Sequence, residues 1–181
     1  MKTLIALSAI VVLSLSPALA QTPAKAPTAQ SLIDAALKTA RAENKVVMLD
    51  FGASWCEWCH YLDKALQSPE LKKLFADNYV LVSLTVQERE EKIALENPGA
   101  EALLEEIGAA KSGIPMLIFL DKDGKRVANS LMMPKGVNIG YPVVPEEITA
   151  FGKLLEMTAP HMTAADRATV VAWLTKNAPK V

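Results

Sequence analysis

Two closely spaced cysteines are the residues of this chain best suited to chemistry. Cys56 and Cys59 enclose a Glu-Trp pair, and the sequence contains no other cysteine. The C-x-x-C spacing is typical of a dithiol that cycles between a reduced form and a disulfide. With His60 directly after it, the motif also has the C-x-x-C-H spacing by which haem is attached covalently. The motif alone leaves both interpretations open.

A purely structural role for these cysteines is disfavoured by their spacing. A disulfide across two intervening residues closes a very short loop and therefore contributes little stability. No second cluster of ligands accompanies the pair, so we expect no metal site. We conclude that the two sulfurs serve a chemical reaction.

The first 20 residues have the pattern of a secretory signal peptide. Lys2 supplies a positive charge, residues 4–15 form a nearly unbroken apolar run, and the small residues of 18–20 fit a cleavage site. The apolar run is shorter than the roughly 20 residues that a membrane-spanning helix needs. We predict cleavage near Ala20, a periplasmic or secreted protein, and no stable insertion into the membrane.

The charge of the chain is small and balanced. Its formal net charge is −1, and no block of basic residues occurs. Binding to nucleic acid or anionic lipid relies on basic surfaces, so neither is expected as a partner. The residues after the signal peptide are enough for one domain with a hydrophobic core. We expect a flexible leader at 21–28 and a single domain at 29–181.

The segments around the motif alternate between helical and strand patterns. Apolar residues recur at helical spacing in 29–43, and 45–51 is a short apolar run typical of a buried strand. The motif opens a second helix, which Ser68-Pro69 interrupts. There we expect Ser68 to cap a third helix with Pro69 at its first position.

Later segments complete a predicted sheet. Residues 79–86 and 112–120 contain further apolar runs, and "DKDGK" at 121–125 is a strong hairpin signal before a last strand. Helices between the earlier strands predict crossover connections, so that part of the sheet should be parallel, with the hairpin as an antiparallel edge. The charged run 87–92 is predicted to be a solvated loop or helix face. The fold class is therefore α/β.

The C-terminal part extends this α/β unit. Residues 131–145 are rich in glycine and proline, which predicts a loop, and two helical segments follow. Thr163 and Asp166 form a capping box at the start of the second. We expect 131–181 to be a loop and a helical extension of the same domain.

The order of these segments resembles the thioredoxin family. "MLDFGASWCEWC" (48–59) is similar to its strand, Asp-Phe pair and Trp-Cys-x-x-Cys, and "SGIP" (112–115) with the following hairpin is similar to its cis-proline loop. The resemblance covers most of 29–130, and it is closer to secreted single-domain members with an added C-terminal helical region than to minimal cytosolic thioredoxin. It implies a thioredoxin fold, with a central mixed sheet flanked by helices and extra C-terminal helices.

The resemblance also implies thiol–disulfide exchange through a redox-active disulfide between Cys56 and Cys59, with no other cofactor. Cys56, at the start of a helix whose free amides stabilise a thiolate, would be the nucleophile. Cys59 would resolve the mixed disulfide, and Asp50, a buried acid, would carry a proton to and from it. Pro115 would be the cis-proline, and the backbone of Ile114 would pair with substrate.

Side chains around the sulfurs are predicted to tune this reaction. Trp55 and Trp58 can form an apolar platform for substrate, although Trp58 can equally cover the core. Glu57 would oppose thiolate formation by its charge, which water screens. His60 would modulate the dithiol from the same helix, or serve as an axial ligand if the motif holds haem.

The sequence departs from the thioredoxin pattern at three places. Glu57-Trp58 replaces the usual Gly-Pro pair between the cysteines. Lys64 stands where the family has the proline that bends the active-site helix, so that bend is not expected. The strand at 79–86 lacks the lysine that partners the buried acid in thioredoxins.

We therefore predict an exported thiol–disulfide oxidoreductase that acts on protein or small-molecule disulfides. Ile114 before Pro115 and the Asp50 match are similar to reducing thioredoxins, which favours reduction. An exported reductase needs a supply of electrons, so a membrane thiol reductase is the inferred donor. The alternatives are a c-type haem-binding electron carrier and a non-catalytic thioredoxin-like binding module.

Overall fold

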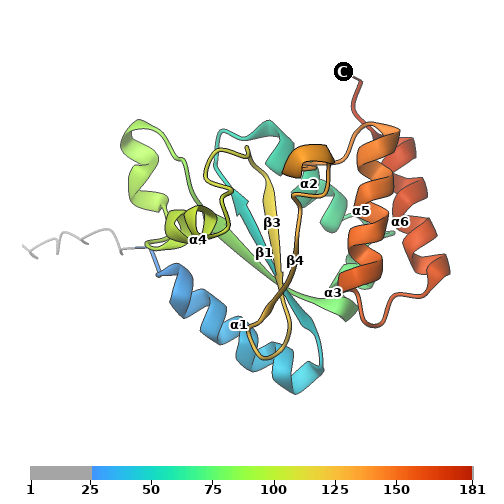
Figure 1. The fold of residues 1–181 in the computed structure, drawn as a ribbon, viewed down its shortest axis with the longest axis horizontal. Coiled ribbons are helices and arrows are strands. Elements are labelled where there is room, and N and C mark those ends of the chain that lie inside the picture. Colours follow the sequence, from blue (N-terminus) through green and yellow to red (C-terminus); the bar gives the residue numbers. More distant parts are fainter. Residues whose placement is uncertain (1–25, 181) are drawn as a thin grey trace, which may run out of the picture.

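The apolar run at 45–51 forms the central strand of the structure, a computed structural model that describes residues 26–180. The four strands are β1 (Val46–Gly52), β2 (Tyr79–Thr85), β3 (Met116–Leu120) and β4 (Arg126–Asn129). They form one mixed sheet in the order β2-β1-β3-β4 (Figure 1). The predicted signal peptide and the first part of the predicted leader, 21–25, lie outside the described residues.

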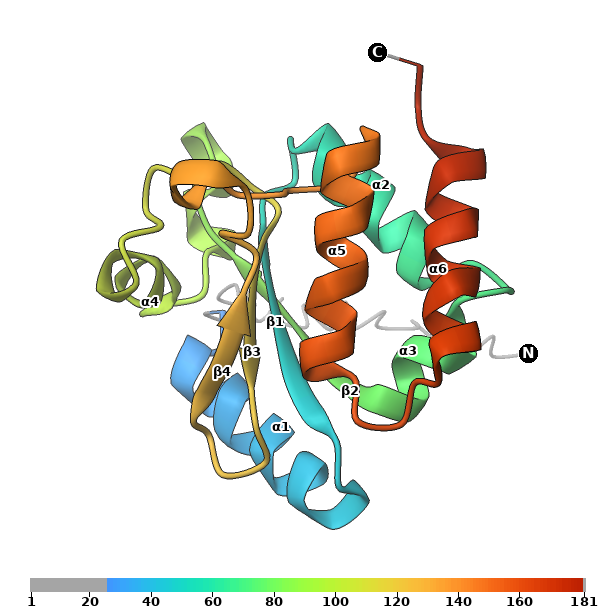
Figure 2. The same ribbon diagram turned by 45° about the vertical axis from the view of Figure 1, so that its right-hand side comes forward.

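Helices cover both faces of this sheet. They are α1 (Ala29–Glu43), α2 (Glu57–Leu66), α3 (Lys72–Asn78), α4 (Ala100–Glu106), α5 (Pro145–Thr158) and α6 (Ala164–Asn177), with short 3-10 helices η1 (Glu90–Leu95) and η2 (Pro134–Gly136). α1 and α4 pack on one face, and α2, α3, α5 and α6 pack on the other (Figure 2). The predicted mixed sheet flanked by helices, with extra C-terminal helices, is confirmed.

Alternation along β1 decides which layer each of its side chains joins, because successive strand residues point to opposite faces. Leu49 and Phe51 belong to the hydrophobic cluster that contains α1. Met48 belongs to the cluster that contains α2 and the C-terminal helices. Asp50 lies two positions after Met48 in β1, so its side chain points to the same face. Its carboxyl group therefore lies on the α2 side of the sheet.

The direction of β3 differs from the prediction. β1 and β2 pair in parallel as expected, but β3 runs antiparallel to β1, with Met116 opposite Phe51. The seven residues of α4 span only about 10 Å, whereas a strand of seven residues spans about 23 Å. α4 alone does not span the sheet, and the rest of the connection, residues 86–115, does not bring the chain back to the opposite end. β3 starts at the end where β1 finishes, which brings the loop before it to the cysteine motif.

The helix after Ser68-Pro69 begins three residues later than predicted. Lys72 is its first residue, and the preceding Leu71 provides no side-chain cap. Ser68 is buried, and its hydroxyl group finds no partner among the described residues. Its carbonyl oxygen instead accepts hydrogen bonds from the N–H groups of Leu71 and Lys72. The segment is a turn that leads into α3.

Two other local predictions are confirmed. In the hairpin at 121–125, the Asp121 carboxylate accepts hydrogen bonds from the N–H groups of Asp123 and Lys125, both at 2.9 Å. At the start of α6, Thr163 and Asp166 form the capping box, in which the Thr163 hydroxyl accepts from the Asp166 N–H at 3.1 Å. These devices are local, so the sequence alone is sufficient to predict them.

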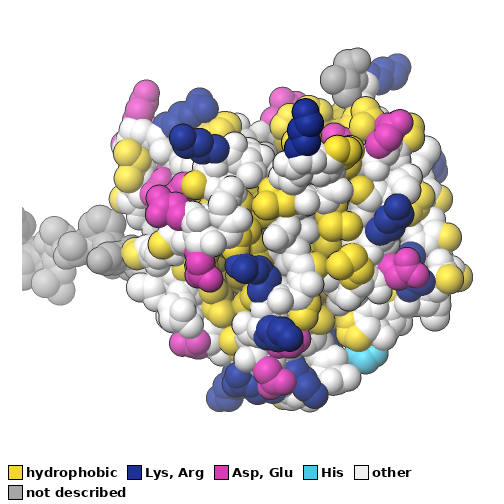
Figure 3. Space-filling view, in the orientation of Figure 1, with side chains coloured by type: hydrophobic (Ala, Val, Ile, Leu, Met, Phe, Trp, Pro, Cys, Tyr) yellow, Lys and Arg dark blue, Asp and Glu magenta, His cyan; other side chains and the backbone are white. Residues whose placement is uncertain are grey.

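The described surface has no dominant charge on the face seen in Figure 3. Lys, Arg, Asp and Glu side chains are interspersed there, while hydrophobic side chains gather toward the middle. None of the described helices has both the length and the apolar composition needed to cross a bilayer.

Candidate active site

The sulfur of Cys56 lies at the N-terminus of α2. Cys56 has an extended backbone and forms the N-cap, and its Sγ accepts a hydrogen bond from the Cys59 N–H at 3.1 Å. The two sulfurs are joined in a disulfide, with 5.3 Å between the Cα atoms. Both side chains are buried. In the reduced protein, the same helix amides would stabilise a Cys56 thiolate, as the sequence predicts.

The loop before β3 faces this disulfide. The Ile114–Pro115 peptide bond is cis. The Ile114 carbonyl oxygen lies 3.6 Å from the Cys56 Sγ, and Ile114 packs against the small buried cluster of Ala53, Cys56 and Cys59. The structure therefore brings Ile114 and Pro115 to the cysteines, although 58 positions separate Ile114 from Cys56 in the chain.

The side chain of Asn138 holds this loop in place. Its amide Nδ2 donates to the Gly113 carbonyl oxygen at 3.1 Å and to the Pro115 carbonyl oxygen at 2.9 Å. Its Oδ1 accepts from the hydroxyl of Ser130 at 2.6 Å and from the Gly140 N–H at 3.2 Å. One side chain of the C-terminal segment thus fixes the backbone on both sides of Ile114.

Asp50 lies beneath the motif, beside a cavity of about 270 Å³. Its carboxyl group is buried, and its Oδ1 has no hydrogen-bond partner among the described residues. Burial, with a smaller contribution from the charge of Asp63, raises the pKa of Asp50 to about 7. Cys59 lines the same cavity, which is large enough to hold water molecules. An acid that titrates near neutral pH beside Cys59 is suited to proton transfer.

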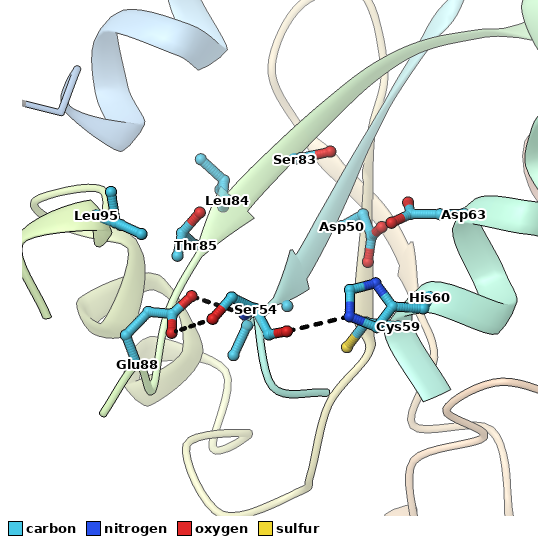
Figure 4. Close-up of a pocket in the computed structure, with 12 residues that line it drawn as sticks. Asp50, Ser54, Cys59, His60, Asp63, Ser83, Leu84, Thr85, Glu88 and Leu95 are labelled. Atoms are coloured by element: carbon cyan, nitrogen blue, oxygen red, sulfur yellow. Dashed lines mark hydrogen bonds between the residues drawn. The ribbon is translucent and has the colours of Figure 1, made fainter. Parts of the chain in front are cut away.

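Asp63 is a second carboxyl group at this cavity. It lies on α2 one turn after Cys59, and Figure 4 shows its carboxyl group and that of Asp50 pointing toward one another. Partial burial raises the pKa of Asp63, and the nearby His60 opposes this rise. The site therefore contains an acid pair.

His60 is engaged within the protein. Its Nε2 lies 3.1 Å from the Ser54 carbonyl oxygen, as the dashed line in Figure 4 marks. The cysteines that would bind haem are bonded to each other. The side chain of His60 is thus held against the backbone that precedes Cys56. No group of three or more potential metal ligands gathers anywhere in the described part of the chain.

The charged run 87–92 is not wholly solvated, because Glu88 is buried against the motif. Its carboxylate accepts hydrogen bonds from the Ser54 N–H at 2.7 Å and from the Ser54 hydroxyl at 2.9 Å. The Trp55 Nε1 donates to the Gln87 carbonyl oxygen at 2.7 Å, and Arg89 stacks 3.8 Å from the centre of the Trp55 ring. This loop therefore fixes the two residues before Cys56, while its other charged residues are exposed.

Trp58 lies half-exposed beside the sulfurs and joins an aromatic cluster. Its ring stacks on Tyr141, with centroids 6.4 Å apart, and lies 5.7 Å from the ring of Tyr61. Trp55 is exposed to a similar extent. Both indoles are accessible next to the disulfide, whereas Glu57 is exposed to solvent in the first turn of α2.

The departures from the thioredoxin pattern have structural counterparts. α2 continues through Lys64 to Leu66 as one helix. Ser83 is the residue of β2 opposite Asp50, and β2 contains no lysine. Burial therefore raises the pKa of Asp50 with no cation on β2 to oppose it.

Three residues of the site were missed from the sequence. Asp63 carried a usable signal, because residues four apart share one face of a helix and Asp63 is four positions after Cys59. No pattern in the sequence indicated Glu88 or Asn138. Their partners lie 34 and 25 positions away in the chain, at Ser54 and Gly113, in loops whose course the sequence does not specify.

Comparison with known proteins gives a family match. A family model described as thioredoxin-like matches residues 28–123. An uncharacterized protein of Caenorhabditis elegans is 28% identical over 116 residues, which cover 60% of this chain and 15% of that protein. The thiol:disulfide interchange protein DsbD of Photorhabdus laumondii is 28% identical over 88 residues, 48% of this chain and 14% of that protein. The chain thus spans a small part of the length of these relatives.

The chain is also similar to solved structures. A disulphide isomerase from Xylella fastidiosa Temecula1 is 21% identical and covers 88% of this chain and 95% of its own, with a TM-score of 0.48. The C-terminal domain of Neisseria meningitidis DsbD in its oxidised form is 25% identical. The match covers 57% of this chain and 84% of that domain, with a TM-score of 0.40. The family match includes the cysteine motif and Pro115, and it ends before the segment 131–181.

Proposed function

Since the chain belongs to the thioredoxin-like family, we propose that it is an exported thiol–disulfide oxidoreductase that reduces disulfides of proteins or small molecules. The observation that carries this proposal is the position of the Cys56 sulfur. It lies 3.1 Å from the Cys59 N–H nitrogen and 3.6 Å from the Ile114 carbonyl oxygen. A helix amide there favours the attacking thiolate, and the adjacent backbone can pair with an extended substrate.

In the reducing direction, the Cys56 thiolate attacks one sulfur of the substrate disulfide. A bond forms between these sulfurs, the substrate disulfide breaks, and its other sulfur leaves as a thiolate that takes a proton from solvent. Cys59 then gives its proton to Asp50 and attacks the Cys56 sulfur, which releases the second substrate thiolate. Two electrons have passed from the dithiol to the substrate, and the Cys56–Cys59 disulfide is formed.

The dithiol must be regenerated by a reductant, and we propose a membrane thiol reductase as the donor. The predicted signal peptide motivates a periplasmic or extracellular location, where a soluble thiol pool is not the usual source of electrons. The similarity of an 88-residue segment to a thiol:disulfide interchange protein supports a partner of this chemical class.

Replacement of each cysteine tests the proposal. Cys56→Ser should reduce insulin, with dithiothreitol as electron source, no faster than dithiothreitol alone. Cys59→Ser should keep the first attack and accumulate a mixed disulfide with insulin, which mass spectrometry detects. If Cys56→Ser keeps the wild-type rate, the proposed reaction is wrong. Equilibration with glutathione tests the direction, because a reductase needs a potential below that of the pool it serves.

A further inference from the structure

We propose that the segment between β4 and α5 builds a pocket beside the disulfide, and that this pocket binds a large apolar side chain of a polypeptide substrate, next to its cysteine. The proposal rests on the proposed exchange reaction and specifies its substrate. The segment crosses the end of the sheet at which α2 begins (Figure 2). The segment lies outside the matched family region, whereas Trp58 and Ile114 of the pocket lie inside it, so the pocket joins the family core to the C-terminal extension.

The pocket is a cavity of about 270 Å³ between the cis-proline loop, α2 and the start of α5. Its lining residues are Trp58, Ile114, Ile139, Gly140, Tyr141, Val143, Val144 and Glu147. This volume is at the small end for a drug-sized ligand and is suited to one or two side chains.

The pocket shares two walls with the redox centre. Ile114 lines the cavity and packs against the cluster that contains the two cysteines, with its carbonyl oxygen 3.6 Å from the Cys56 Sγ. Trp58 lies between the cysteines in the chain. Its ring stacks on that of Tyr141, and both residues line the cavity. A substrate whose sulfur reaches Cys56 would therefore place a neighbouring side chain at the mouth of the pocket.

The lining residues favour an apolar occupant, because all but one of them are uncharged. Glu147 is the one charged residue among those lining the pocket. Its carboxylate accepts hydrogen bonds from the N–H groups of Val143 at 2.9 Å and Val144 at 3.3 Å, so it is already engaged by the backbone. An anionic side chain would be repelled by this carboxylate, and any charged side chain would lose hydration on entering the mainly apolar pocket. A Phe, Leu or Met side chain would lose only unfavourable contact with water.

The pocket is held open before substrate arrives. Asn138 accepts the Gly140 N–H and donates to the carbonyl oxygens of Gly113 and Pro115, so it ties one wall to the other. A preformed site avoids the cost of ordering loops on binding. The pocket contributes binding alone, and the covalent step remains the exchange at Cys56.

Paired peptide substrates test the proposal. Two peptides would differ only in having Phe or Ser beside the cysteine, and each would be presented as a mixed disulfide with glutathione to the pre-reduced protein. Release of the peptide thiol gives the second-order rate. We expect the Phe peptide to react about tenfold faster than the Ser peptide, since burial of one large apolar side chain is worth at least that factor.

Val144→Asp removes the apolar character of the pocket with little risk to the fold. Val144 is 44% exposed and is the N-cap of α5, a position at which Asp is preferred. This variant should reduce the Phe-over-Ser preference to less than about twofold, because the pocket then holds a carboxylate. The matched control is Val137→Asp, the same change at a residue of the same segment that is 57% exposed and does not line the pocket. It should keep the tenfold preference.

The outcomes separate the pocket from the reaction. Equal rates for both peptides with the wild-type protein, or an unchanged preference in Val144→Asp, would overturn the pocket while leaving the exchange reaction intact. If neither peptide reacts, the proposed exchange itself is wrong, and the substrate pocket falls with it. Loss of preference in both variants would show a general charge effect and would also overturn the pocket.

Discussion

Asp50 is an acid placed where its charged form is poorly solvated, and this has a consequence for stability. Its pKa is about 7 in the folded protein and near 3.8 in an unfolded chain. Between these values the folded state keeps a proton that the unfolded state has lost, so the free energy of unfolding falls as pH rises. Below about pH 4 the group costs nothing, and above about pH 7 it costs its full penalty.

Asp50→Asn should remove this dependence. Relative to the variant, the wild-type protein should lose on the order of 4 kcal/mol of unfolding free energy between pH 4 and pH 8. Urea unfolding of the oxidised proteins at several pH values measures the difference. Asp77→Asn, at an exposed position of α3, should keep the wild-type profile. Parallel profiles for wild type and Asp50→Asn would contradict a buried, high-pKa acid.

The acid pair gives a second prediction at this scale. The negative charge of Asp63 contributes to the raised pKa of Asp50, so Asp63→Asn should lower the pKa of Asp50. NMR titration of the Asp50 carboxyl carbon in the oxidised protein measures it. Glu57→Gln, which neutralises an exposed carboxylate in the first turn of the same helix, should leave the Asp50 titration unchanged. A titration that does not move in Asp63→Asn would mean that the two carboxyl groups do not interact.

The residues closest to the sulfurs could be predicted from the sequence because they are local to one strand and one helix. Asp50, Cys56 and Cys59 lie within ten positions, and the alternation of β1 with the first turn of α2 is enough to place them. Asp63 follows from the same helical periodicity. Glu88 depends on a loop with left-handed backbone at Gln87 and Glu90, which no local pattern specifies.

At the scale of elements, the cis-proline loop depends on a side chain from another segment. Asn138→Ala would leave the carbonyl oxygens of Gly113 and Pro115 without their donor. We expect a loss of about 1–3 kcal/mol in unfolding free energy and a slower exchange with peptide disulfides, because a partly buried network loses its centre. Urea unfolding and peptide kinetics measure these two effects.

The matched control is Asn177→Ala at the exposed end of α6, where the amide donates only to the Trp173 carbonyl oxygen of its own helix. It should change the unfolding free energy by a few tenths of a kcal/mol and leave the exchange rate unaltered. Similar losses in both variants would argue against a specific role for Asn138.

The direction of β3 shows which element properties a sequence does not specify. The positions of β1, β2, β3 and the hairpin were predicted because apolar runs and turn residues mark them. The direction of β3 depends on the path of residues 86–115 between β2 and β3, which no periodic pattern specifies. This connection is longer than the dozen or so residues that a crossover needs, so a helix within a long connection does not by itself predict a crossover.

At the scale of the whole molecule, α5 and α6 share a core with the sheet. Leu154 and Leu155 of α5 belong to the same buried cluster as Met48 and Phe119. The Thr158 hydroxyl donates to the Leu154 carbonyl oxygen at 2.8 Å, so the Tyr79 hydroxyl donates to Thr158 at 2.7 Å and links β2 to α5. The C-terminal helices should therefore unfold together with the sheet.

Leu155→Ala tests this cooperativity. It should lower the unfolding free energy by about 2–5 kcal/mol, because the side chain is fully buried. Far-UV circular dichroism and amide exchange of α6 should report one shared transition. Met157→Ala, on the exposed side of the same helix, should cost less than about 0.5 kcal/mol. Loss of α6 protection before the sheet melts would contradict a single cooperative unit.

The role of 131–181 was the part least accessible to sequence reasoning. Its helices and its loop were predicted from periodicity and from glycine and proline content. Their contacts with the redox centre run through Asn138 and Tyr141, whose partners are distant in the chain. Such contacts form only when the helices and the sheet have packed together, so no periodic pattern in the sequence indicates them.

The amide of Asn138 has one further consequence. A shortened chain that stopped after β4 would retain every residue of the cysteine motif and the proline facing it. It would nevertheless lack Asn138, which holds the cis-proline loop, and the residues after β4 that line the pocket beside the sulfurs. If the pocket binds substrate as we propose, the smallest portion of this protein that distinguishes between substrates is longer than the portion that carries its reactive atoms.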